Sequence, residues 1–220
     1  MADSLKKIAA ELIVFDLDGT LADSLPDLAV AANYTCRRLG LPERSPAVVA
    51  GMIGGGERKF MERLAGPDHQ DLVDDCLKIY LDYYSAHCSD LTRLYPGVRE
   101  TLELMSGKRL AVLSNKFQPL TERVLETLGI AHFFRVRRGG GAGLALKPSP
   151  EPLTAIIREL GAEARRTLMV GDKPADISTG RGAGARVAVV TYGYGDLESL
   201  QAAAPDFLLA RFDQLMDIVE

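Results

Sequence analysis

The chain has 220 residues, of which 47% are hydrophobic, so it is long enough for one large domain or two small ones around a sizeable core. Its formal net charge is −4 at pH 7, and no block of like charges indicates a nucleic-acid surface. No apolar run approaches the roughly 20 residues that span a bilayer, so we expect neither nucleic acid nor a membrane as a partner.

The first predicted element is a buried strand over Leu12-Ile13-Val14-Phe15, followed directly by Asp16-Leu17-Asp18-Gly19-Thr20. Side chains two residues apart on a strand project to the same face, so Asp16 and Asp18 should lie together where the strand opens into a loop. Ligands bind at this carboxyl end in an open α/β sheet. Two carboxylates repel each other, and a divalent cation on Asp16 with a protonated Asp18 would relieve this. The five residues alone also fit a simple turn.

The next segment, from about residue 23 to residue 94, contains no convincing strand and is predicted to be helical. Asp16 and Ser114 are separated by far more residues than the roughly 2–6 of a usual βα loop. We therefore predict that residues 23–94 form an inserted helical subdomain and that residues 1–22 and 95–220 form the core. The expected helices are Leu28–Leu39, Ala47–Met52, Glu57–Leu64 and Asp71–Ser85.

The remainder of the chain alternates short apolar runs with amphipathic stretches. This alternation predicts a parallel sheet with helices on both faces. The run Arg135–Arg138 fits a strand with one solvated face, and residues 139–143 fit a loop. The other expected strands are Leu110–Leu113, Leu168–Val170, Val187–Val190 and Phe207–Leu209, and the expected helices are Leu120–Leu128, Pro152–Leu160, Ala175–Ala183 and Phe212–Val219.

Three further motifs fall at predicted strand ends or helix starts. Ser114-Asn115-Lys116 offers a hydroxyl and backbone N–H groups that can hold an anion. Lys147 can hold both Asp16 and a phosphate. Asp172 and Asp176 are hard oxygen ligands of the kind that Mg2+ prefers. Each motif is weak alone, but a chance assembly of all of them in this order is improbable.

Together these motifs resemble those of the haloacid dehalogenase superfamily of phosphohydrolases. The stretch Asp16–Ser24 is similar to the first motif of that family, and Ser114, Lys147 and Gly171-Asp172…Asp176 are similar to the second, third and fourth. Within the superfamily the chain most resembles the phosphoglycolate phosphatase group. The resemblance implies an α/β fold, with a doubly wound, Rossmann-like parallel sheet and an inserted all-helical cap. The supporting segments are Gly54-Gly55-Gly56, Tyr95–Leu102, Leu113–Lys116 and Thr191–Gly195.

The resemblance implies a Mg2+-dependent phosphomonoesterase that acts through an aspartyl-phosphate intermediate. Asp16 would attack phosphorus, and Asp18 would protonate the leaving alkoxide and then deprotonate the attacking water. Mg2+ would be held by the carboxylates of Asp16 and Asp172 and by the backbone carbonyl of Asp18, with Asp176 acting mainly from behind these ligands. The expected phosphate-binding residues are Gly19, Thr20, Ser114, Asn115 and Lys147.

The expected substrate is a small phosphorylated metabolite such as 2-phosphoglycolate. Gly55 and Arg58 are candidate substrate contacts in the cap, although a solvated helix face fits Arg58 equally well. Lys173 departs from the family pattern, which usually has a small hydroxyl residue there. We expect its side chain to point to solvent, and the alternatives are an effect on metal affinity or a contact with substrate. Alternatives are a β-phosphoglucomutase-like phosphomutase and a phosphatase of sugar phosphates.

Rival classes fit less well. A phospho-accepting receiver domain is about half this length, a 2-haloacid dehalogenase would not need Asp18, and a non-catalytic relative would usually lack a motif residue. The three cysteines (Cys36, Cys76 and Cys88) are widely spaced, and residues 1–11 lack the apolar core of a secretory signal. We therefore expect a cytoplasmic enzyme.

Overall fold

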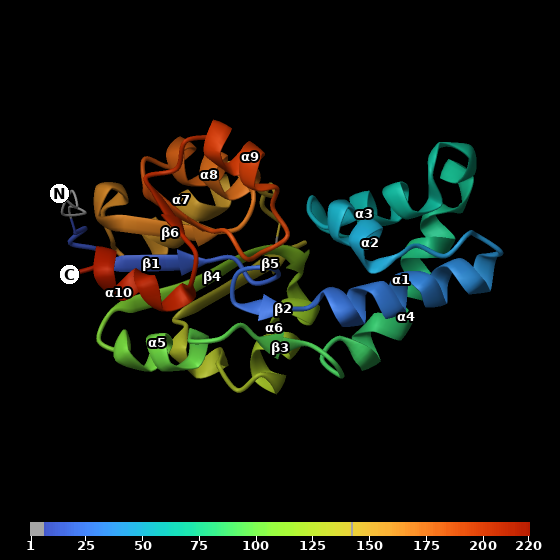
Figure 1. Ribbon diagram of the computed structural model, residues 1–220, viewed down its shortest axis with the longest axis horizontal. Helices are drawn as coiled ribbons and strands as arrows, with labels where there is room; N and C mark the ends of the chain where they lie inside the picture. Colours follow the sequence, from blue (N-terminus) through green and yellow to red (C-terminus); the bar gives the residue numbers. More distant parts are fainter. Residues whose placement is uncertain (1–6, 142) are drawn as a thin grey trace.

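The computed structural model describes residues 7–141 and 143–220. Two lobes lie side by side (Figure 1). One lobe is a six-stranded sheet between two layers of helices, and the other is built from helices. The predicted class, an α/β fold with a doubly wound parallel sheet and an inserted helical part, is confirmed.

The sheet has the strand order β5-β4-β1-β6-β7-β8, and every neighbouring pair is parallel. The first strand is therefore central: Phe15 pairs with Val112 on one side and Val170 on the other. The carboxyl ends of three strands thus meet around the residue that follows Phe15. The strands are β1 (Leu12–Phe15), β4 (Arg109–Phe117), β5 (Val136–Gly140), β6 (Thr167–Gly171), β7 (Arg186–Val190) and β8 (Phe207–Leu209).

Alternate side chains of the central strand enter two apolar layers. Ile13 and Phe15 are buried in one, and Leu12 and Val14 are buried in the other. Burying one such side chain contributes about 1.5–3 kcal/mol, so both faces hold this strand in place. The first layer is covered by α5 (Val98–Leu104), α6 (Gln118–Thr127) and α10 (Leu215–Ile218), and the second by α7 (Glu151–Glu159), α8 (Pro174–Gly182) and α9 (Leu197–Ala202) (Figure 1).

The helical lobe begins with α1, which has a proline in its first turn and ends at Gly40 in the left-handed conformation. Its buried face packs against α4, and Tyr34 stacks on Tyr83 between the two helices with ring centroids 4.2 Å apart. The elements are α1 (Leu25–Leu39), α2 (Pro46–Met52), α3 (Gly56–Ala65), the 3-10 helix η1 (Pro67–Leu72) and α4 (Val73–His87).

Two chain segments connect the lobes, and they pair with each other. β2 (Ala22–Asp23) and β3 (Arg93–Leu94) form a short antiparallel ladder. The expectation that residues 23–94 contain no strand is therefore wrong at its two ends, because adjacent connections can satisfy each other's backbone groups. The boundaries 1–22, 23–94 and 95–220 stay a prediction.

Other departures are local. β4 continues beyond the predicted end at Leu113 to Phe117, with an irregular register against β5, so the Ser114–Lys116 motif belongs to the strand end. The closing helix begins as a 3-10 turn, η4 (Phe212–Gln214). The short helices α5 and α9 are not predicted from the sequence. Over the described residues, no helix combines the length and apolar character that a bilayer span requires.

Candidate active site

Asp16 and Asp18 leave the end of β1 and line the same cavity, as the spacing predicts. Asp16 Oδ1 accepts a hydrogen bond from the backbone N–H of Leu17 at 2.7 Å. The same oxygen lies 2.9 Å from Lys147 Nζ. Burial raises the pKa of Asp16 to about 6, although the charge of Lys147 opposes this shift. The carboxylate is thus held in a fixed position by one amide and one ammonium group.

Lys147 joins two motifs that are distant in sequence. Its Nζ lies 2.9 Å from Asp16 and 2.7 Å from Asp176, and only 4% of the residue is exposed. Burial by itself lowers the pKa of a lysine, but the two carboxylates hold this pKa above its usual value. Lys147 is therefore a permanent positive charge beside Asp16.

Asp172 directly follows β6, Asp176 lies in the first turn of α8, and both are buried. Asp176 Oδ2 accepts hydrogen bonds from the backbone N–H groups of Asp172 at 3.2 Å and of Lys173 at 3.0 Å. Asp172 Oδ2 accepts from Tyr194 N–H at 2.7 Å. Burial, followed by the charges of Asp16 and Asp176, raises the pKa of Asp172 to about 8. Asp176 is thus paired with the Lys147 ammonium, whereas Asp172 accepts from a backbone N–H and has the more strongly raised pKa.

Gly19 permits the close approach of the first motif to the fourth. It has φ +86°, and a Cβ added there would lie 2.3 Å from Asp172 Oδ2. Thr20 is buried beside it, and its hydroxyl donates to Asp172 Oδ1 at 3.4 Å. The phosphate-binding roles of Gly19 and Thr20 stay predictions, because both lie behind Asp172 rather than among the cavity-lining residues.

One group of carboxylates in the described part of the chain has the geometry to hold a metal ion. One oxygen each from Asp16, Asp172 and Asp176 lies within 4.8 Å of the others. Such a set of hard oxygen donors suits Mg2+, and among the described residues the ammonium that pairs with it is that of Lys147. The residues present therefore fit a divalent cation.

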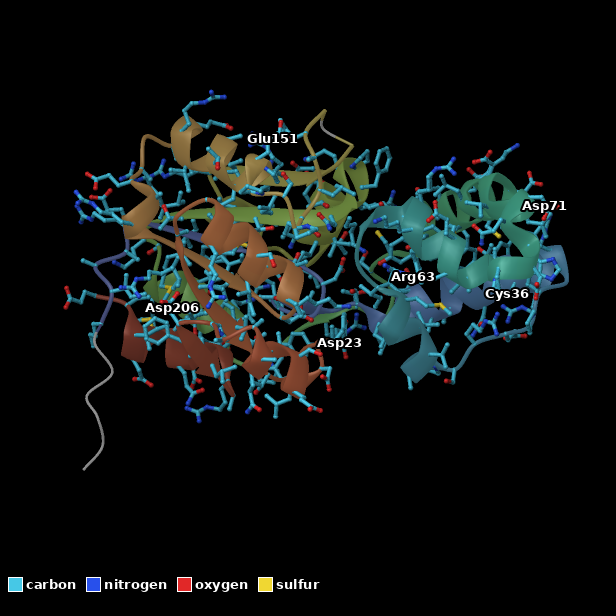
Figure 2. The ribbon with its side chains drawn as sticks, turned by 90° about the horizontal axis from the view of Figure 1, so that it is seen from above. Asp23, Cys36, Arg63, Asp71, Glu151 and Asp206 are labelled. Carbon is cyan, nitrogen blue, oxygen red and sulfur yellow. The ribbon has the colours of Figure 1, made fainter. Side chains whose placement is uncertain are left out.

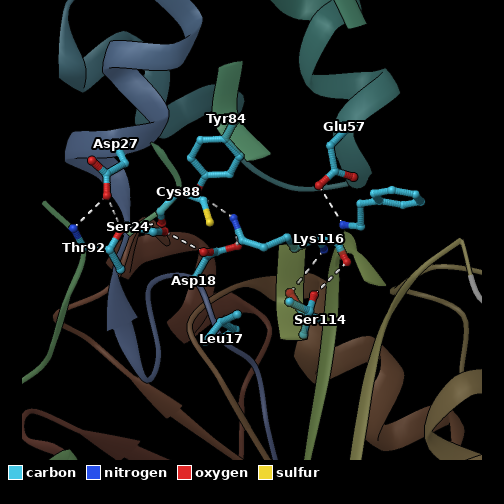
Figure 3. A network of polar contacts seen from close by, with 12 residues as sticks. Leu17, Asp18, Ser24, Asp27, Glu57, Tyr84, Cys88, Thr92, Ser114 and Lys116 are labelled. Carbon is cyan, nitrogen blue, oxygen red and sulfur yellow. Dashed lines mark hydrogen bonds and ion pairs between the residues drawn. The ribbon is translucent and has the colours of Figure 1, made fainter. Parts of the chain in front are cut away.

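Asp18 has a different set of partners (Figure 3). Its Oδ1 accepts from the Ser24 hydroxyl at 2.6 Å, and its Oδ2 lies 3.2 Å from Lys116 Nζ. Lys116 is buried and also donates to the Tyr84 hydroxyl of α4 at 2.9 Å. Asp18 is thus oriented by the core, by the lobe connection and, through Lys116, by the helical lobe.

Ser114 and Asn115 lie beside this network and line the same cavity. Ser114 Oγ accepts from the Lys116 N–H at 3.2 Å. The Asn115 side chain donates to the Lys147 carbonyl at 2.9 Å and accepts from the Lys147 N–H at 2.8 Å. Asn115 therefore fixes the loop that carries Lys147, a contact that the sequence does not reveal.

The cavity between the lobes has a volume of about 80 Å³ and is lined on the cap side by Ile53 and Gly54-Gly55-Gly56, among others. The carbonyls of Met52 and Gly54 accept from Arg63 at 2.6 Å each, and Figure 2 shows Arg63 within the helical lobe, on the side nearer the sheet. Gly55 lines the cavity as expected, but its substrate contact stays a prediction. So does that of Arg58, which is exposed and pairs with Asp74 at 2.5 Å.

The expectation that Lys173 points to solvent is wrong. Its Nζ donates to the Ile53 carbonyl at 2.5 Å, and the residue lines the cavity. Burial lowers the pKa of this lysine. The aliphatic chain crosses from the loop after β6 to the cap, where a Cβ added at Gly54 would lie 3.9 Å from its Cδ.

Several residues at the site receive no role from the sequence. Ser24, Tyr84 and Lys116 orient Asp18, as described above. The Tyr194 hydroxyl accepts from the Ser24 N–H at 2.8 Å, and Glu57 of α3 accepts from the Phe117 N–H at 2.7 Å. Lys116 stands inside a quoted motif and could have been singled out as a charge there. Tyr84 fits an ordinary core position, and no sequence signal marks it. Tyr194 stands inside the segment Thr191–Gly195 that supports the resemblance, but the sequence gives it no role of its own.

Comparisons with known proteins agree with this geometry. A model of the haloacid dehalogenase-like hydrolase family matches residues 13–190. The phosphoglycolate phosphatase of Aquifex aeolicus is 36% identical over 211 residues, which are 95% of this chain and 96% of that protein. That of Haemophilus influenzae is 36% identical over 219 residues, with 95% and 98% covered.

Solved structures agree as well. The crystal structure of a predicted phosphoglycolate phosphatase from Haemophilus somnus has a TM-score of 0.86 and 31% sequence identity to this chain, with 96% of this chain and 98% of that one covered. The match includes both the sheet and the helical lobe, since it spans nearly all of each chain. The chain therefore belongs to the haloacid dehalogenase-like hydrolases and is a phosphoric monoester hydrolase.

Proposed function

We propose that the chain hydrolyses a small, acidic phosphomonoester, 2-phosphoglycolate, with Mg2+ as cofactor and an aspartyl-phosphate intermediate on Asp16. The observation that carries this proposal is the pairing of Asp16 with Lys147 at 2.9 Å beside two further buried carboxylates. This arrangement combines a positioned nucleophile with a fixed positive charge where phosphoryl oxygens would lie.

The chemistry needs two steps. In the first, a carboxylate oxygen of Asp16 bonds to phosphorus while the bond to the leaving alkoxide breaks, and Asp18 gives that alkoxide its proton. In the second, Asp18 takes a proton from a water molecule that attacks phosphorus, and the bond to Asp16 breaks to release phosphate. Ser24 and Lys116 hold the two oxygens of Asp18 during this exchange.

Asp16, Asp172 and the backbone carbonyl of Asp18 are the proposed ligands of Mg2+, with Asp176 supporting the site through its hydrogen bonds to the loop. When bound, Mg2+ supplies positive charge that offsets the repulsion between the carboxylates and the phosphate dianion. Lys147 and the residues Ser114 and Asn115 would hold the remaining phosphoryl oxygens.

The helical lobe, residues 23–94, is proposed to cover the leaving group. Substrate must enter the site, whereas bulk water must stay out during transfer. The curated relatives named as phosphoglycolate phosphatases support 2-phosphoglycolate as the substrate. The three free cysteines are buried, which supports a cytoplasmic location.

Phosphate release from a panel of phosphomonoesters, with MgCl2 and with EDTA, tests the proposal. The expected result is Mg2+-dependent turnover with the highest kcat/KM on 2-phosphoglycolate. A phosphatase that works fully in EDTA would contradict the metal role. A clear preference for a sugar phosphate would contradict the proposed substrate.

A further inference from the structure

Lys173 occupies an unusual position among the lysines of the cavity. Three lysines line it: Lys116, Lys147 and Lys173. Lys147 pairs with Asp16 and Asp176, and Lys116 pairs with Asp18. Within residues 7–141 and 143–220, no carboxylate lies within ion-pair distance of Lys173, whose acceptor is the neutral carbonyl of Ile53. Lys173 is thus, in this part of the chain, the one cavity lysine whose charge is not matched by an ion pair.

Its place in the cavity is also specific. Lys173 follows Asp172 on the loop after β6, and its side chain runs to the cap, where a Cβ added at Gly54 would lie 4.0 Å from Nζ. In a phosphoryl transfer the leaving oxygen departs opposite the attacking oxygen. Because Asp16 attacks from the core, the leaving group points to the cap. The Lys173 side chain lies between the core loop and the cap, where that leaving group would be.

We propose that Lys173 selects the substrate by pairing with a carboxylate on the leaving group of the phosphomonoester. This inference rests on the proposed function and adds to it the residue that distinguishes an acidic substrate from a neutral one. An ammonium carries three N–H donors, and the Ile53 carbonyl occupies one of them. The other donors of Lys173 can therefore bind a carboxylate.

The cap contributes to the same position. α3 begins at Gly56, which lines the cavity, and the N-terminus of a ten-residue helix favours negative charge. Arg63 holds the carbonyls of Met52 and Gly54, so these two acceptors are already occupied by a cation. Arg58 is another cation near this loop, but it is exposed and paired with Asp74.

The test compares two substrates that differ only in the charge of the leaving group: 2-phosphoglycolate and its amide, 2-phosphoglycolamide. Lys173→Met removes the charge and keeps most of the chain length. We expect kcat/KM on 2-phosphoglycolate to fall about 10- to 100-fold, mainly through KM, as for a hydrogen bond to a charged group. On the amide, kcat/KM should change less than about 2-fold, because the neutral amide forms no ion pair with Lys173 that the substitution could remove.

Three further variants complete the experiment. Lys173→Arg keeps the charge and should retain much of the preference for the carboxylate. Lys78→Met removes the same charge from an exposed residue of α4 that does not line the cavity, and it should leave kcat/KM on both substrates unchanged. If thermal unfolding shows that Lys173→Met does not fold, Lys173→Gln replaces it in the same comparison of the two substrates.

Equal losses of kcat/KM on the two substrates in the Lys173 variants would overturn the inference. A wild-type enzyme that hydrolyses the carboxylate and the amide equally well would overturn it too. If the wild type instead prefers 3-phosphoglycerate to 2-phosphoglycolate, the proposed substrate is wrong. Lys173 is then tested with 3-phosphoglycerate and its amide, and the inference stands only if Lys173→Met removes the preference between that pair.

Discussion

The Tyr84 hydroxyl of α4 lies 2.9 Å from Lys116 Nζ, and this ammonium lies 3.2 Å from Asp18 Oδ2 (Figure 3). The same ammonium lies 4.7 Å from the centroid of the Tyr84 ring. A residue of the helical lobe is therefore in contact with the group that holds the proposed acid. The position of α4 and the orientation of Asp18 are linked through one buried side chain.

Tyr84→Phe tests this link. The change keeps the ring and removes a hydrogen bond to a charged group, a contact worth about 1.5–3 kcal/mol. We expect kcat/KM on an alkyl phosphate to fall several-fold more than kcat/KM on p-nitrophenyl phosphate, because only a basic alkoxide requires a well-placed proton donor. Steady-state kinetics on both substrates gives the ratio, and Tyr83→Phe on the same helix is the control. An equal loss on the two substrates would mean that Tyr84 has no influence on Asp18.

Asp18→Asn should show a larger difference between the loss on an alkyl phosphate and the loss on p-nitrophenyl phosphate than Tyr84→Phe does. The amide keeps the shape of the side chain but cannot carry a proton to the leaving group. We expect a loss of about 100-fold or more on an alkyl phosphate, within the range that general acid–base catalysis contributes, and a smaller loss on p-nitrophenyl phosphate. The kcat/KM values of the purified variant on both substrates measure this, because they report on the step in which the leaving group departs and not on hydrolysis of the intermediate. If both kcat/KM values fall by one factor, another group is the acid.

The metal-free protein should lose stability as the pH rises. The pKa values of Asp16 and Asp172 are raised to about 6 and about 8, above those of an unfolded chain. The folded state therefore binds more protons, and the contribution to stability, complete below about pH 4, is lost as the pH rises through 6 and 8. Thermal unfolding in EDTA should give a Tm that falls over this range.

Excess MgCl2 should reverse that trend, since a dication replaces the protons on these carboxylates. Asp172→Asn should flatten the slope in EDTA and reduce the response to MgCl2. A Tm in EDTA that rises steadily from pH 5 to pH 8 would contradict the raised pKa values.

Gly55→Val tests whether the glycine loop contacts the substrate. Gly55 has φ +83° and lines the cavity. Gly40 has φ +70° at the end of α1, and apart from its chain neighbours no described residue has an atom within 4 Å of a Cβ added there. A side chain at either position costs about 1–2 kcal/mol of backbone strain. We expect both Gly55→Val and Gly40→Val to lower Tm. Only Gly55→Val should raise KM and change the ranking of substrates across a phosphomonoester panel; an unchanged ranking would place the specificity elsewhere.

The sequence predicts the parts of this site that depend on local pattern. The apolar run before Asp16 identifies a buried strand, and the period of two residues puts Asp18 on the same side. The order of strands and helices then brings Lys147 and Asp172 to the same edge of the sheet. These features follow from the alternation of strands and helices and from the positions of strand ends, both of which can be recognised in the amino-acid sequence.

Contacts between distant segments could not be predicted in this way. The direction of Lys173 depends on the carbonyl of Ile53, 120 residues away in sequence. The hydrogen bond between Tyr84 and Lys116 depends on how α4 packs against the core. In the sequence, a tyrosine on the apolar face of an amphipathic helix cannot be distinguished from a residue that only packs in the core. The ladder of β2 and β3 is too short to produce a periodic signal.

The central claim is that Asp16 is phosphorylated during turnover. Rapid acid quenching of the enzyme with Mg2+ and phosphorus-labelled 2-phosphoglycolate, followed by peptide mapping, tests it directly. We predict label on the peptide that contains Asp16, removable by hydroxylamine, and a folded Asp16→Asn variant with neither label nor turnover. Label on another residue, or more than a few per cent of wild-type turnover in Asp16→Asn, would contradict the account.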